Sequence, residues 1–149
     1  MATTATPRRR TAPSRQAGYC VAATVNAVVL YLILVRPGWR EVPILTDDTS
    51  RVIGLLTVSL FVGMAFNLLY AINDAAWLTS LGGVATTAIG LAVLWRIWQV
   101  FPFDFGDATA DWPMVARVVL IFAIAGSAIG IVTQFVSLLG ALAQPETDK

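Results

Sequence analysis

The sequence predicts an all-α, membrane-embedded four-helix bundle, and three observations lead to this fold class. Hydrophobic residues make up 57% of the 149 residues. Charged residues make up only 13%, against about a quarter in a typical soluble domain, so too few charges are present to cover a water-facing globule. The charges are also confined to short stretches, which leaves four long uncharged runs.

Each uncharged run has the length of a membrane-spanning helix. The runs hold 19, 21, 21 and 26 residues and cover 17–35, 52–72, 75–95 and 118–143. About 20 helical residues cross a bilayer core. A spanning segment must be a helix or part of a closed barrel, and these runs lack the alternation of barrel strands. A soluble bundle would carry polar stripes at heptad spacing, and none of the runs has a charged stripe.

We expect one transmembrane domain over residues 17–143, with a polar segment at each end. The expected helices cover about 17–36, 51–72, 76–100 and 113–143. Residues 1–16 are rich in Thr, Ala, Pro and Arg, which predicts a disordered basic tail, and residues 144–149 form a polar tail. A basic stretch before an apolar run is also typical of a signal peptide. However, the run does not end in a small-x-small cleavage site, so we expect the first helix to be retained.

The connections predict which helix ends lie together. Residues 36–51 and 96–117 form long polar loops on one side of the membrane, and residues 73–80 form a short turn on the other. The four arginines among residues 8–15 favour a cytoplasmic N-terminus, and four spans return the C-terminus to the same side. Five basic residues then lie on each side, so orientation depends on the first helix.

Two helix starts are marked by capping residues. The run Thr46–Ser50 has the composition of an N-cap for the second helix. Asp111 followed by Pro113 is typical of the start of the fourth helix.

The two hairpins share the spacing of some polar and basic positions. Asn26 and Thr86 lie ten residues before Arg36 and Arg96, and Asn67 and Thr133 lie sixteen residues after Arg51 and Arg117. A tandem repeat of two helical hairpins would explain this spacing. Chance is the alternative, because the residues themselves differ.

Four arginines are expected at the same end of the bundle: Arg36, Arg51, Arg96 and Arg117. One interpretation is a polar vestibule that binds a charged ligand or a partner. The other is that they extend to the membrane interface and pair with loop carboxylates at modest gain, which we favour. The pattern Phe101-x-Phe103-x-Phe105 near this end has two similar interpretations, an interfacial aromatic belt or a surface for a partner.

The candidate polar residues inside the membrane are Asn26, Asn67 and Gln134. Such side chains most often form hydrogen bonds between helices, and a polar path is the alternative. No Asp, Glu, Lys or His lies within any uncharged run, which argues against an ion-coupled transporter. Gly126 and Gly130 form a GxxxG motif, which predicts close helix packing either within the chain or between chains.

The residues for known enzyme chemistry are missing. The chain has no histidine and one cysteine, which excludes Ser-His and Cys-His pairs and cysteine metal clusters. We therefore predict no catalytic, cofactor-binding or metal-binding residues, and we expect Cys20 to be a buried, inert thiol. A lipid-acting enzyme with Asp104 or Asp107 as base is the weakest alternative. A net charge of +1 gives no reason to expect nucleic-acid binding.

The stretches Val35–Pro43 and Arg96–Phe105 resemble those of small four-span integral membrane proteins of actinobacteria, and arginine supplies nine of the ten basic residues. The resemblance covers most of the chain after the tail and implies the topology, but no activity. We predict a multi-pass, non-enzymatic protein of the bacterial cell (inner) membrane. Beyond the lipid bilayer, its expected partner is a second copy or another membrane protein. A small oligomeric channel or transporter component for a small solute is the alternative.

Overall fold

The structure, a computed structural model, describes residues 12–73, 75–106 and 111–143. Four α-helices make up most of this part of the chain, and two short 3₁₀ turns lie between the first and second helices. The elements are α1 (Ala12–Leu34), η1 (Trp39–Glu41), η2 (Asp47–Thr49), α2 (Ser50–Ile72), α3 (Ala76–Val100) and α4 (Trp112–Ala143). The all-α fold class predicted from the sequence is confirmed.

The helix boundaries lie close to the expected ones except at the start of α1. This helix begins at Ala12, so the last five residues of the expected tail are helical. Pro13 does not prevent this, because the first turn of a helix has no intrahelical partner for its N–H groups. The predictions for residues 1–11 and 144–149, and for Asp107, fall outside the described residues.

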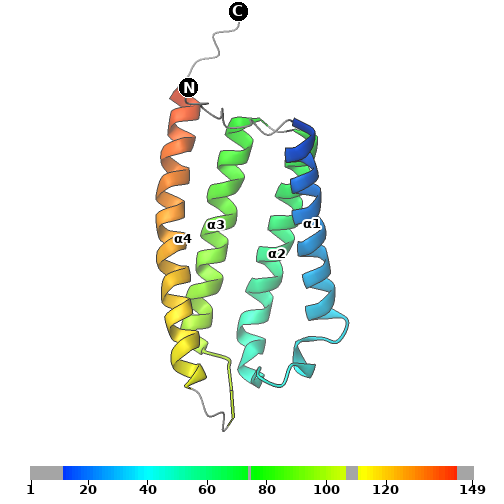
Figure 1. Ribbon diagram of the computed structural model, residues 1–149, viewed down its shortest axis with the longest axis vertical. Helices are drawn as coiled ribbons and strands as arrows, with labels where there is room; N and C mark the ends of the chain where they lie inside the picture. Colours follow the sequence, from blue (N-terminus) through cyan, green and yellow to red (C-terminus); the bar gives the residue numbers. More distant parts are fainter. Residues whose placement is uncertain (1–11, 74, 107–110, 144–149) are drawn as a thin grey trace, which may run out of the picture.

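The helices pack in chain order. Extensive contacts join α1 to α2, α2 to α3 and α3 to α4, and Figure 1 shows the four helices side by side in this order. Figure 1 also shows that the two longer connections share one end of the bundle, as the sequence predicts, and that the α2–α3 turn lies at the other. The bundle is therefore an open row in which each outer helix packs mainly against one neighbour.

Most large apolar side chains face outward. Within the described residues, six apolar side chains other than proline are buried: Ala23, Val52, Tyr70, Leu78, Val93 and Leu120. Large apolar side chains of every helix are exposed, for example Val58 on α2 and Phe122 on α4. Each of the four helices is also long and apolar enough to cross a membrane. A bundle of this kind has its apolar surface where lipid would cover it, which is the reverse of a soluble bundle.

The start of α4 agrees with the expected cap, and the start of α2 does not. The backbone N–H of Met114 donates to Asp111 Oδ1 at 3.2 Å, as an N-cap aspartate should. Thr49 at the start of α2 makes no side-chain capping bond. The turn η2 precedes this helix, and its own backbone bonds replace the cap, because the N–H of Ser50 donates to the carbonyl oxygens of Asp47 and Asp48.

The contact between α2 and α3 depends on one glycine. A Cβ atom at Gly82 would overlap the hydroxyl of Tyr70 and the ring of Phe66, with Phe66 Cε1 at 2.8 Å. The two rings lie 5.9 Å apart between their centroids, and the Tyr70 hydroxyl donates to the carbonyl oxygen of Thr79 at 3.5 Å. Small residues let helices approach closely where lipid provides no hydrophobic drive, and Gly82 does so here.

We predict that Gly82→Ala destabilises the protein by about 1–3 kcal/mol, the usual range for overpacking. The matched control is Gly90→Ala on the same helix, where no atom lies within 4 Å of the new Cβ. This control should leave stability unchanged or raise it by up to about 1 kcal/mol, the helix preference of Ala over Gly. Unfolding in mixed micelles measures both variants, and equal effects would contradict the assigned contact.

Candidate functional site

The two long connections are joined to each other at one end of the bundle. Leu45 and Phe103 form an isolated antiparallel bridge. The N–H of Thr46 donates to the carbonyl oxygen of Pro102 at 3.1 Å, and the N–H of Asp104 donates to that of Ile44 at 3.0 Å. We call residues 35–49 and 101–106 together the loop layer. These backbone bonds tie the α1–α2 hairpin to the α3–α4 hairpin at the membrane surface.

The three phenylalanines of the loop layer pack against one another along the second connection. Phe101 and Phe103 meet edge to face with ring centroids 5.5 Å apart, and Phe103 and Phe105 are stacked at 6.0 Å. None of the three is fully exposed, and Pro102 is buried among them. The pattern therefore packs in part on the chain's own first connection, an arrangement that neither sequence interpretation included.

The four arginines lie at this end, as expected, but they do not form one cluster. Arg51 Nη1 lies 3.3 Å from Asp48 Oδ1 in an exposed ion pair, and Arg96 Nε donates to the Arg51 carbonyl oxygen at 3.5 Å. The Arg117 guanidinium lies 4.5 Å from the ring centroid of Phe101, and Arg36 is exposed beyond the end of α1. Exposed pairs of this kind contribute little, so the arrangement matches interfacial arginines better than a charged binding site.

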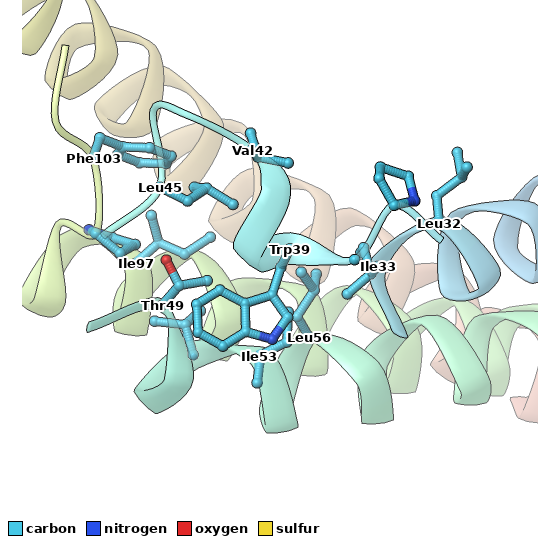
Figure 2. Close-up of a pocket in the computed structure, with 14 residues that line it drawn as sticks. Leu32, Ile33, Trp39, Val42, Leu45, Thr49, Ile53, Leu56, Ile97 and Phe103 are labelled. Atoms are coloured by element: carbon cyan, nitrogen blue, oxygen red, sulfur yellow. The ribbon is translucent and has the colours of Figure 1, made fainter. Parts of the chain in front are cut away.

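Beneath the loop layer lies a cavity of about 370 Å³, drawn in Figure 2. Its walls come from the ends of α1, α2 and α3 and from both connections. The lining residues are Leu32, Ile33, Pro37, Gly38, Trp39, Val42, Leu45, Thr49, Val52, Ile53, Leu56, Ile97, Pro102 and Phe103. Nearly all of these side chains are apolar, so the cavity is a hydrophobic compartment at the boundary of the membrane-spanning region.

Thr49 contributes the one side-chain hydroxyl among the residues that line this cavity. Its side chain is 5% exposed, and its Oγ1 is the one buried side-chain polar atom without a hydrogen-bond partner among the described residues. Figure 2 shows this oxygen among the carbon side chains of the cavity. A buried hydroxyl without a partner is costly, so an acceptor that reached it and took a hydrogen bond from it would offset this cost.

Inside the membrane-spanning region, Asn26 and Asn67 lie around one glycine. A Cβ at Gly63 of α2 would be 3.1 Å from Asn26 Nδ2 of α1, so the Asn26 amide packs against this glycine. Asn67 Nδ2 donates to the Gly63 carbonyl oxygen at 2.7 Å within its own helix. Both amides therefore lie at the α1–α2 contact, and their role in helix packing stays a prediction.

Gln134 makes the corresponding contact in the second hairpin. Its Oε1 accepts a hydrogen bond from Thr87 Oγ1 at 3.0 Å and would lie 3.3 Å from a Cβ at Gly83. The Gln134 amide of α4 thus packs against a glycine of α3, as the Asn26 amide of α1 packs against a glycine of α2. The candidate polar residues are divided between two helix contacts, α1–α2 and α3–α4.

The two glycines of the GxxxG motif have different surroundings. A Cβ at Gly130 would lie 3.8 Å from Thr87 Cγ2 of α3, whereas no atom lies within 4 Å of a Cβ at Gly126. Gly126 is exposed, so the motif only partly serves packing within the chain.

The expectation of a buried thiol was wrong, because Cys20 is exposed on α1. The error follows from the open row of helices, in which an apolar position of an outer helix faces lipid more often than a neighbour. Among the described residues, no group of three or more His, Cys, Asp or Glu side chains is placed to hold a metal ion.

Sequence reasoning assigned Thr49 to a helix cap and Trp39 to the interfacial aromatic belt, not to a cavity wall, and it gave Gly82 no role. The first two belong to a loop that reads as polar, and only the fold shows that it turns back over apolar helix ends. Gly82 belongs to no motif or spacing pattern that the sequence analysis used. However, the adjacent glycines Gly82 and Gly83 within a spanning helix are themselves a signal of close packing.

No protein-family model, curated protein or solved structure matches the chain. The resemblance to actinobacterial four-span proteins therefore stays a prediction. Four apolar helices of membrane-spanning length define the class of the chain, a multi-pass membrane protein.

We predict that Thr87→Val and Gln134→Leu are coupled in a double-mutant cycle by about 0.6 kcal/mol, and by no more than about 1.7 kcal/mol, as for other interhelical hydrogen bonds in membranes. Thr133→Val is the matched control, because the Thr133 hydroxyl donates to Gly130 of its own helix. Unfolding in mixed micelles measures the four stabilities. Strict additivity of the two substitutions would show that the bond contributes nothing.

Proposed function

We propose that the protein is a non-enzymatic component of the bacterial inner membrane that acts by associating with a second copy of itself through α4. The observation that carries this proposal is the open surface at Gly126, a glycine of a GxxxG motif, where an added Cβ would have no atom of another helix within 4 Å. Such motifs support close contacts between membrane helices, and half of this one is available to another molecule.

The residues around Gly126 give this surface a defined shape. Phe122, Ile129 and Thr133 lie four residues before, three after and seven after Gly126, so they share its helix face. Phe122 is 73% exposed and Ile129 is 66% exposed. The Thr133 hydroxyl is already bonded within the helix. Two large apolar side chains therefore border Gly126, which α3 does not cover, although Gly130 one turn later contacts Thr87 of α3. A second helix can pack closely against Gly126.

The positions of the polar side chains favour self-association over a transport role. A solute path needs polar groups that converge on one lumen, whereas Asn26 and Gln134 pack in different helix pairs. Helix contact, by contrast, needs only the exposed apolar face and the glycine.

We predict that Gly126→Leu abolishes self-association, because the larger side chain keeps the two helix backbones apart. Gly54→Leu on α2 is the matched control, since Gly54 is also exposed and has no atom within 4 Å of a new Cβ. Disulfide crosslinking through Ile129→Cys in a Cys20→Ser background, in membranes, reports the contact. A monomeric parent protein, or crosslinking that survives Gly126→Leu, would refute the proposal.

The proposed orientation places both chain ends in the cytoplasm and the loop layer on the outer face of the inner membrane. Reporter fusions test this directly. A phosphatase fused after Asn73 should be inactive and one fused after Asp104 active, and a cytoplasmic reporter at these two sites should give the opposite pattern. The inverse result would reverse the orientation while leaving the four spans in place.

A further inference from the structure

We propose that the cavity beneath the loop layer is a binding site for one acyl chain of a membrane phospholipid, with the Thr49 hydroxyl donating to an ester carbonyl of that lipid. This proposal is independent of self-association through α4, since the cavity is formed by α1, α2, α3 and the loop layer.

The lining decides the chemistry of the occupant. A water molecule in a buried site needs two to four polar partners, and this wall provides apolar side chains and a single hydroxyl. The volume, about 370 Å³, falls within the range of ligand pockets, roughly 300–1,000 Å³. The cavity therefore favours a flexible hydrocarbon over water.

The single hydroxyl favours a hydrocarbon ligand that also carries a hydrogen-bond acceptor. Thr49 Oγ1 is buried without a partner at the start of α2, where the membrane-spanning region begins. In a phospholipid the ester carbonyls lie between the acyl chains and the headgroup. A chain that enters toward Leu56 would therefore place its ester near Thr49.

A polar cleft beside the cavity supplies a place for the headgroup. It shares Ile33, Pro37, Gly38 and Trp39 with the cavity and adds Arg40 and Glu41. The Arg40 guanidinium lies 4.6 Å from the Trp39 ring centroid, which holds a positive charge at the common border. The apolar chamber and a cation thus share a border, as the acyl chain and the phosphate of one lipid would require.

The test is native mass spectrometry of the full-length protein in detergent, titrated with phosphatidylglycerol. We expect one tightly retained lipid per chain. Leu56→Trp fills the cavity and should weaken binding by at least about tenfold, whereas Val58→Trp on the exposed side of the same helix should leave it unchanged. Equal retention by the two tryptophan variants would overturn the proposal.

Thr49→Val separates lipid binding from a merely structural role and covers the case in which Leu56→Trp does not fold. Loss of one hydrogen bond should lower lipid affinity about 2- to 12-fold. Lipid-free stability should not fall, because the substitution removes an unpartnered buried hydroxyl. Unchanged affinity, or a loss of lipid-free stability that accounts for the loss of binding, would show that Thr49 does not bind the ester.

Two further titrations identify the source of the chain. Arg40→Gln should weaken phosphatidylglycerol binding about 2- to 5-fold, the range of an exposed charge pair, and leave diacylglycerol binding unchanged. A polyprenyl phosphate offers a hydrocarbon and a phosphate without an ester. If it is retained while phosphatidylglycerol is not, the acyl-chain assignment is wrong.

Discussion

The outward orientation of the apolar side chains is the constraint on which the rest of the structure depends. With six buried apolar side chains besides Pro102 in the described part of the chain, the helices do not enclose a core large enough to hold them together in water. Helices satisfy their own backbone hydrogen bonds, so they can expose apolar faces to lipid at no cost in unpaired polar groups. Because lipid is then the solvent, apolar side chains can face outward. The protein interior consists only of narrow contacts between neighbouring helices.

Those contacts are built from glycines that receive a larger group from the next helix. Gly63 receives the Asn26 amide, Gly83 receives the Gln134 amide, and Gly82 receives the Phe66 and Tyr70 rings. In lipid, packing and interhelical hydrogen bonding replace the hydrophobic effect as the forces that hold helices together. A glycine that lets two helices approach closely therefore stabilises their contact more than an additional apolar side chain would. The loop layer joins the two hairpins at one end by backbone bonds, and it creates a cavity because its apolar side chains fold back over the helix ends.

The sequence predicts the four helices well because long uncharged runs have few other solutions in a chain this apolar. It predicts the residues of the polar contacts but not their partners. The proposed repeat pairs Asn26 with Thr86, whereas the residue that bonds to Gln134 is Thr87. One residue rotates a helical side chain by about 100°, so spacing along the chain could not fix which face meets the neighbour. The cavity was out of reach for a different reason, since Trp39 and Phe103 come together only when two distant loops pair.

The glycine-centred contacts, the uncovered Gly126 face and the apolar cavity have a common physical basis, because each is expected of a helix bundle that lies in lipid. The most direct test is the environment of the outward side chains. Spin labels at Val25, Val58 and Val132, each in a Cys20→Ser background in liposomes, should collide more often with oxygen than with a water-soluble nickel chelate. Greater access for the chelate, or protection from both reagents, would contradict a four-helix bundle whose apolar faces lie in the bilayer.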